Sequence, residues 1–204
     1  LLEEYLHGLD FSGKTIQLGK DIDLESREWI PIGGNNAEDS GGKAFRGTFD
    51  GQGYSVSNVY ISTGYHYVGF FGSVNGGTVQ NFGVRSGSVT GGNKSAGLTG
   101  YINGTISNCY SRASVGGTSY AAGLAGMSGK SQISHSYAVA TVTATGGAGG
   151  LVGYYASSGK NSAITNCYAA CTLSGRSSGG LVCTVNSSVT GFTITNSYAL
   201  SGPS

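Results

Sequence analysis

The feature that most constrains the fold of this chain is an internal repeat of about 27 residues. One signature of the repeat is a glycine, a bulky apolar residue, one further residue and a second glycine. It occurs in five copies, the last of which ends in cysteine, at residues 69–72, 97–100, 123–126, 150–153 and 180–183. The spacings are 28, 26, 27 and 30 residues, and self-similarity at periods of about 20 to 50 residues is typical of solenoids and other stacked arrays.

A second signature consists of an aliphatic residue, a polar residue, Asn, a small or apolar residue and usually Tyr. Its Asn position is occupied in turn by Asn58, Asn81, Asn108, His135, Asn166 and Asn196. Two signatures in phase predict that equivalent positions stack in columns. Asn tolerates the left-handed backbone conformation, and its amide can bond along a stack of equals. We therefore expect a bend at this column, with the aliphatic residue before Asn and the small residue after it pointing inward, and the Tyr outward or at a corner.

The composition favours a folded β structure over a flexible linker. Glycine accounts for 38 of the 204 residues and charged residues for 10%, against averages of about 7% and 25%, but aromatic residues make up 10%, which a disordered Gly/Ser segment would lack. Short β-branched stretches alternate with Gly, Asn and Ser, and no helical period is sustained after Gly51. The sequence predicts an all-β fold, a right-handed parallel β-helix (solenoid) of about six coils with three strands and three corners per coil; a propeller or an antiparallel sandwich fits the phasing less well.

The first 50 residues are predicted to form a small N-terminal capping segment. They hold all ten acidic residues and five bases, a net charge of −5, whereas residues 51–204 hold six bases and no carboxylate side chain, a net charge of +6. Solenoid ends need a polar cover because an open edge invites aggregation. We expect residues 1–50 to be a cap with leading strands and residues 51–204 to be the repeats, in one continuous domain. Within the cap we expect a helix end over residues 1–9 and strands over residues 15–18 and 29–32.

The cysteines Cys109, Cys167, Cys171 and Cys183 show no zinc-type spacing. Cys109 and Cys167 occupy the same repeat position two repeats apart, so stacking would separate them by about 10 Å, more than the roughly 7 Å between Cα atoms that a disulfide tolerates. We expect separate buried thiols. No run approaches the roughly 18 apolar residues of a membrane helix. The chain begins at Leu1 without Met, so we interpret it as a processed or truncated piece whose export signal and anchor lie outside it.

These residues resemble the GLUG-repeat family, named for a Gly-Leu-any-Gly core. The closest match to the family pattern is residues 150–153 followed by residues 164–169. The segment that often precedes such repeats is resembled by residues 21–24, 29–33 and 45–53. The pattern is broken at Cys183, His135 and Gly83. The resemblance implies a large bacterial secreted or cell-surface protein. Such proteins include adhesin-like ones and the non-catalytic regions of IgA-specific metalloproteases. In that setting the repeats would be a stalk or a binding module.

No catalytic constellation stands out, and we expect no catalytic residue and no enzyme activity in this chain. Glycoside hydrolysis uses two carboxylates about 5 to 9.5 Å apart, and no carboxylate side chain follows Asp50. Asp21 with Asp23 is the most suggestive pair, although a solvated or turn-capping pair is the simpler interpretation. Residues 175–179 match G-x-S-x-G in letters only, and residues 129–131 resemble the end of a phosphate loop without a following helix. A β-helix polysaccharide lyase or hydrolase working at the cap is the less favoured alternative.

We expect no metal site and no cofactor. His7, His66 and His135 show no ligand spacing, and the clustered carboxylate oxygens that calcium needs are available only in residues 38–39 and 21–25. The Lys and Arg residues are scattered, so we expect no nucleic-acid partner, and we expect no membrane insertion within this chain.

The best binding candidates are tyrosines predicted to align as an exposed stripe: Tyr110, Tyr137, Tyr168 and Tyr198. The stripe would stack on a sugar or engage a protein, so the expected partner is a host glycan or a protein ligand; the alternative is that the rings simply pack on one another, as cross-strand pairs do. The first hypothesis is a non-catalytic bacterial surface or secreted module for adhesion, binding or spacing, placed outside the cell or on its surface. The second is an accessory region of a large exported protease or other enzyme whose active site lies outside this chain. The oligomeric state stays open.

Overall fold

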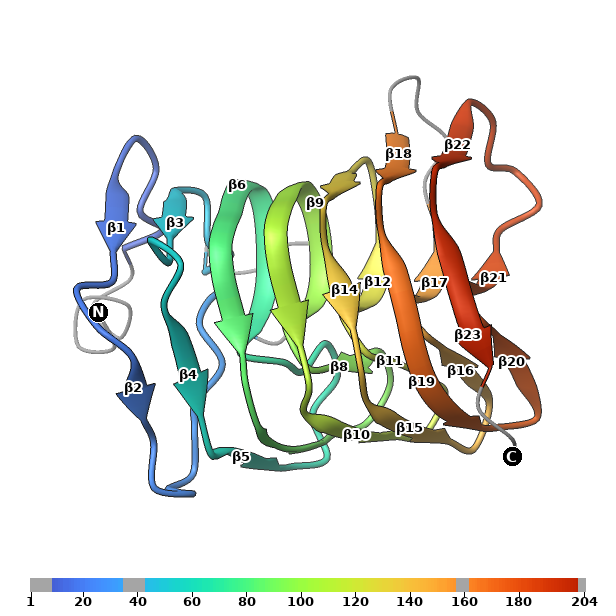
Figure 1. The fold of residues 1–204 in the computed structure, drawn as a ribbon, viewed down its shortest axis with the longest axis horizontal. Helices are drawn as coiled ribbons and strands as arrows, with labels where there is room; N and C mark the ends of the chain where they lie inside the picture. Colours follow the sequence, from blue (N-terminus) through green and yellow to red (C-terminus); the bar gives the residue numbers. More distant parts are fainter. Residues whose placement is uncertain (1–8, 35–42, 157–161, 202–204) are drawn as a thin grey trace.

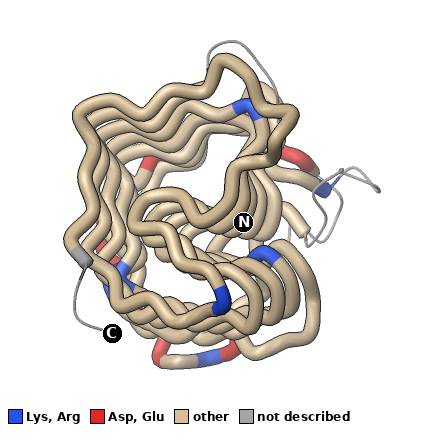
Figure 2. Tube along the Cα trace, turned by 90° about the vertical axis from the view of Figure 1, so that its right-hand side faces the viewer, with Lys and Arg blue, Asp and Glu red and all other residues tan. Residues whose placement is uncertain are grey.

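Every strand pairing in the described part of the chain is parallel and joins one coil to the next. The computed structural model describes residues 9–34, 43–156 and 162–201, and no helix occurs within them. The strands follow one another along a single axis, from β1 (Thr15–Gln17) to β22 (Phe192–Thr195) and β23 (Tyr198–Ser201) (Figure 1). Seen down this axis, the coils lie over one another (Figure 2). The predicted all-β parallel solenoid is therefore confirmed.

A full coil contributes to five rows of short strands, and not to the three that we expected. The first row contains the start of β6 (Phe71–Val84), the start of β9 (Thr99–Ser111), β12 (Ala125–Ser128), β17 (Val152–Tyr155) and β21 (Val182–Val185). The second row contains β1, β3 (Thr48–Asp50), the middle of β6 and of β9, β13 (Gln132–Ser134), β18 (Ser162–Thr165) and β22. The third row contains β2 (Ile22–Asp23), β4 (Ser55–Ser57), the ends of β6 and β9, β14 (Tyr137–Ala138), the start of β19 (Tyr168–Ser174) and β23.

Two further rows close the coil. The fourth row contains β5 (Val59–Ser62), β7 (Gly87–Thr90), β10 (Ser114–Gly117), β15 (Thr141–Ala144) and the end of β19. The fifth row contains β8 (Ser95–Ala96), β11 (Tyr120–Ala122), β16 (Gly147–Gly149) and β20 (Ser177–Gly179). In the later coils, turns that contain Gly, Asn or Ser separate the rows into short strands, whereas β6 and β9 each run through the first three rows.

The repeats lie in register, as their phase predicts. The clearest column is the apolar position of the second row, which contains Ile16, Phe49, Val79, Ile106, Ile133, Ile164 and Ile194. The residue pairs Ser107–Ser134 and Ser134–Thr165 place Asn108 and Asn166 two layers apart in one column. This is the arrangement on which the solenoid prediction depended.

The corner after the second row is held by left-handed residues. Asn81, Asn108, His135, Asn166 and Asn196 all have φ between 49° and 54°, a conformation that Asn tolerates better than most residues. Part of the column also forms a side-chain ladder, because the Asn108 amide donates to the Asn81 side-chain oxygen at 3.1 Å and the Asn166 amide lies 3.0 Å from His135 Nε2. The predicted bend is therefore confirmed.

Asn58 is left-handed as well (φ 57°), but its predicted place in this column is wrong. Val56 pairs with Val84, so Asn58 lies one row further along, at the level of Ser86, whose hydroxyl accepts from the Asn58 backbone N–H at 2.9 Å. Gly51 occupies the position next to Asn81, because Asp50 pairs with Gln80. The sequence around Asn58 resembles the motif, but the register of strand pairing determines which row and column a residue occupies, and it places Asn58 elsewhere.

The core consists of a large cluster that runs along the inside of the coils and a smaller one between the fourth and fifth rows, which includes Val115, Ala121 and Val142. In the internal coils the residues on both sides of the corner Asn point inward, as expected: Ile106 and Cys109 flank Asn108, and both are buried. The apolar residue of the glycine motif is buried too, as in Leu98 and Leu124.

Phenylalanines fill the N-terminal end of the solenoid. The ring centroid of Phe49 lies 5.1 Å from that of Phe71 and 4.9 Å from that of Phe82. Strands β1 and β3 pair in line with the second row of the repeats, so this segment supplies leading strands. The expected strand at residues 15–18 is present as β1 (Thr15–Gln17), but residues 29–32 make only one isolated bridge, Ile32–Phe71, which follows the bridge Glu28–Tyr60 just before them. The predicted helix end lies outside the described residues, apart from Leu9.

Candidate binding site

The four tyrosines of the predicted stripe lie in one column and stack face to face. Strand register pairs Tyr110 with Tyr137, Tyr137 with Tyr168 and Tyr168 with Tyr198. The ring centroids are 5.1, 4.8 and 5.6 Å apart, and the ring planes meet at 7°, 5° and 11°. The spacing follows from the distance between neighbouring strands, about 4.8 Å.

Stacking covers most of the flat ring faces in this tyrosine ladder. Each inner ring lies between two others, and the Tyr110 ring lies against Gly83, where an added Cβ would collide with it. With the Tyr110 ring in this position, residue 83 has no space for a side chain. Tyr198, at the far end, is 57% exposed. Within residues 9–34, 43–156 and 162–201, the ladder therefore presents ring edges, hydroxyl groups and the exposed ring of Tyr198 to solvent.

Arg112 places a positive charge against the ladder. Its guanidinium lies 5.7 Å from the Tyr110 ring centroid and 5.9 Å from that of Tyr137, and its Nη2 donates to the Tyr137 hydroxyl at 3.5 Å. Partial burial, followed by the neighbouring tyrosine hydroxyls, raises the pKa of Tyr168, while Arg112 opposes the shift. Tyr168 therefore keeps its proton at physiological pH, and the positive charge of Arg112 lies beside the ladder.

A second basic residue is also covered by aromatic rings. The ammonium nitrogen of Lys94 lies 4.7 Å from the ring centroid of Tyr120 and 5.0 Å from that of Tyr154, and it donates to Asn93 Oδ1 at 3.0 Å. Burial lowers the pKa of Lys94. Arg112 and Lys94, two of the six bases that follow Gly51, are thus engaged with tyrosines of the solenoid itself.

The carboxylates that were weighed as catalytic groups accept hydrogen bonds from neighbouring chain segments. Asp21 Oδ1 accepts from the backbone N–H of Ser55 at 2.8 Å and from its hydroxyl at 3.1 Å. Asp23 Oδ1 accepts from the Glu25 backbone N–H and from the Asn58 amide, both at 2.8 Å. These two hydrogen bonds, the backbone one first, hold the pKa of Asp23 below its ordinary value. Both side chains thus fasten the first coil to the second.

The described residues contain no cluster of His, Cys, Asp and Glu that could hold a metal ion. All four cysteines are free thiols, and Cys109 and Cys167 are buried in one column on either side of Ser136, as expected. Burial raises the pKa of the Cys109 thiol to about 12 and also raises the pKa of Cys167 and of Cys171. Within the described ranges there is also no helix with the length and apolarity needed to cross a bilayer.

A cavity that the sequence analysis missed lies where the fifth row begins. The first coil passes directly from Glu28 to Ile32, whereas the second coil needs eleven steps to pass from their partners, Tyr60 to Phe71. The third coil also needs eleven steps, from Ser88 to Thr99. The corner of the second coil therefore projects past the shorter first coil. No motif marks this mismatch, and only the difference in segment length could have revealed it.

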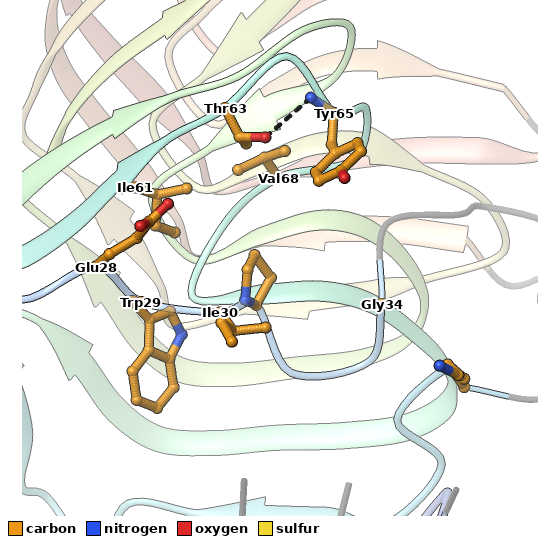
Figure 3. A pocket seen from close by; sticks show the side chains of 10 residues that line it. Glu28, Trp29, Ile30, Gly34, Ile61, Thr63, Tyr65 and Val68 are labelled. Atoms are coloured by element: carbon orange, nitrogen blue, oxygen red, sulfur yellow. Dashed lines mark hydrogen bonds between the residues drawn. The ribbon is translucent and has the colours of Figure 1, made fainter. Parts of the chain in front are cut away.

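The cavity has a volume of about 340 Å³ and lies between the short segment of the first coil and residues 61–68 of the second. Figure 3 shows Trp29 and Ile30 on one side and Ile61, Tyr65 and Val68 on the other. Its lining is therefore mainly apolar and aromatic, which is common in small-molecule sites.

The fold and these surfaces define a β-solenoid repeat protein. No family profile matches the chain. Over 86 residues, 41% of the chain, the sequence is 37% identical to Halomucin from Haloquadratum walsbyi, and the match spans 1% of Halomucin. A solved structure of a candidate immunoglobulin A1 protease from Bacteroides ovatus has a TM-score of 0.59 and 23% identity to this chain, and the match covers 91% of this chain and 68% of the other. At this identity the likeness shows a shared fold.

Proposed function

We propose that this chain is a rigid module of an exported or surface-displayed bacterial protein, and that it binds a partner or spaces other modules without performing catalysis itself. The observation that carries the proposal is that the polar side chains that could serve in catalysis form hydrogen bonds within the solenoid. Asp21, Asp23 and the corner Asn residues form hydrogen bonds between coils, so they serve the solenoid. The resemblance to GLUG repeats supports the same function.

Two measurements test the proposal. Antibodies against the solenoid should label intact cells of the source organism, or protein in their medium, and an external protease should remove the surface signal. Incubation with a panel of polysaccharides should release no new reducing ends and form no unsaturated products. Labelling only after cell lysis would contradict export, and turnover of any polysaccharide would contradict the non-catalytic role.

The second candidate is an accessory region of a large exported protease. The fold shared with the Bacteroides ovatus structure, a candidate immunoglobulin A1 protease, favours it. The full-length gene separates the two functions, because a downstream H-E-x-x-H segment supports the accessory region and a cell-wall anchor supports the surface module.

A further inference from the structure

The cavity wall formed by the second coil is held in place by the third coil. The Gly92 backbone N–H donates to the Tyr65 carbonyl at 2.7 Å, and the Tyr67 N–H donates to the Asn93 carbonyl at 2.9 Å. The Asn93 N–H donates to His66 Nδ1, also at 2.9 Å. The loop that carries Tyr65 is therefore fixed before any ligand arrives, and preorganisation reduces the cost of binding.

Tyr65 presents a free ring at this cavity. It is 66% exposed, more than any other large hydrophobic residue of the described chain, and its ring makes no contact with another aromatic ring there, unlike the rings of the ladder. Trp29 differs, because it stacks on Phe70 with centroids 4.7 Å apart and planes at 8°, and its Nε1 donates to the Phe70 carbonyl at 3.0 Å. Trp29 is thus a fixed wall, and Tyr65 is the aromatic surface available to a ligand.

Polar groups line the same cavity beside an apolar floor. The floor includes Ile61 and Val68, both buried. The Glu28 carboxylate has no ion-pair partner within the described ranges. The Thr63 hydroxyl oxygen accepts from the Tyr65 backbone N–H at 3.3 Å, so its own proton stays available for donation. An apolar face, an aromatic ring and hydrogen-bonding groups thus converge in one place.

We propose that this cavity binds a neutral sugar ring, as the ligand of the binding module suggested under Proposed function, on which this inference rests. A pyranose has an apolar C–H face, which fits against Tyr65, and hydroxyl groups, which can donate to the Glu28 carboxylate. An apolar peptide side chain would instead leave Glu28 covered and unpaired, which is costly. The charges of Glu28 and Lys43, both in the lining, sum to zero, so a neutral ligand fits better than a charged one.

The experiment uses Trp29 as the reporter, because it is the only tryptophan of the chain and lines the cavity. The whole chain is titrated with neutral oligosaccharides, in one set from glycoproteins and in another from polysaccharides, and Trp emission is recorded. We expect a saturable change in emission with at least one of them. The responding set identifies the source of the sugar.

Substitutions inside and outside the cavity locate the binding. Tyr65→Ala should weaken it about tenfold or more, because the stacking surface is lost, whereas Tyr65→Phe should retain most of it. Glu28→Gln, which changes no packing, should also weaken it and serves if Tyr65→Ala fails to fold. Tyr54→Ala removes a partly exposed tyrosine that does not line the cavity and is the matched control, for which we expect unchanged binding. Tyr198→Ala tests the tyrosine ladder as the alternative binding surface.

The proposal is overturned by any of three results. These are no emission change with any neutral sugar, a response to an apolar peptide alone, or sugar binding that is lost in Tyr198→Ala and retained in Tyr65→Ala. Loss of the sugar site would leave the exported, non-catalytic module intact, because cell labelling and the turnover assay test that function separately.

Discussion

At the scale of single residues, Asp50 shows how a side chain fastens one coil to the next. Its Oδ1 accepts from the Gln52 backbone N–H at 2.9 Å and from the Asn81 amide at 3.0 Å, and its Oδ2 accepts from the Gln52 amide at 2.7 Å and the Gln80 amide at 3.0 Å. Burial by itself would raise the pKa of Asp50, but these hydrogen bonds outweigh it and hold the pKa below its ordinary value. Asp50 thus starts the polar ladder that the corner Asn residues continue.

Replacing Asp50 should therefore destabilise the fold in a pH-dependent way. Asp50→Asn places an amide NH₂ against the donors and should lower the free energy of unfolding by about 1 to 3 kcal/mol at pH 7. Because the folded pKa lies below the unfolded one, the carboxylate contributes its stability above the unfolded pKa, about 3.9, and this contribution is lost as the pH falls through the folded pKa.

Urea unfolding of both proteins at a series of pH values measures this difference. Glu25→Gln is the control, because the Glu25–Arg27 pair is mostly exposed and such pairs contribute about 0 to 1 kcal/mol. A difference between wild type and Asp50→Asn that stays constant down to pH 2 would contradict the role given to the carboxylate.

The thiols provide a second prediction at this scale. Cys183 is half-buried, whereas Cys109, Cys167 and Cys171 are buried and have raised pKa values, and a thiol reacts as its thiolate. A disulfide reagent at pH 8 should modify Cys183 first in the folded protein and all four thiols after unfolding. Rapid reaction of Cys109 in the folded state would show that the core opens locally.

At the scale of elements, the first glycine of the Gly-Leu-any-Gly motif marks a close approach across the coil. A Cβ added to Gly123 would lie 2.5 Å from the Cβ of Ala138 and would also collide with the Gly150 carbonyl. Equivalent glycines face small residues in the same way, since Gly150 faces Ala169 at 2.6 Å. The first glycine of the motif therefore lets the corner between the fifth and first rows pack closely against the third row.

Gly123→Ala should accordingly lower the free energy of unfolding by about 1 to 3 kcal/mol, the usual cost of overpacking. The matched control is Gly116→Ala in β10, where the nearest atom to an added Cβ, Thr90 Oγ1, is 3.4 Å away. We expect a change within about 0.5 kcal/mol there. Equal losses in thermal or urea unfolding would mean that backbone freedom, and not the close approach, selects glycine.

At the scale of the whole molecule, each coil depends on its neighbours for burial. Ile133 in an internal coil is 1% exposed, whereas Ile194 in the same column is 44% exposed, in the last described coil. In stacked repeats the stability is approximately a sum of repeat and nearest-neighbour terms, so the same substitution should have a position-dependent cost.

We expect Ile133→Ala to lower the free energy of unfolding by about 2 to 5 kcal/mol, and Ile194→Ala by less than half as much. Chemical denaturation measures both values, and amide hydrogen exchange should show stronger protection in β13 than in β22. Equal losses at the two positions would show that a further layer covers Ile194 in solution, for example another copy of the chain.

The sequence by itself determined the solenoid and its left-handed Asn corner, because motifs repeated in phase place equivalent residues on one line when the coils stack. It also indicated the tyrosine column. Only the tertiary structure decided which column each segment joins and how many rows a coil has. Asn58 lies outside the Asn column, and a full coil contributes to five rows. The physical reason is that the hydrogen bonds between neighbouring strands determine the register of each segment, and a short local sequence motif does not. The short passage from Glu28 to Ile32, which creates the cavity, became visible only when the longer second coil lay over it.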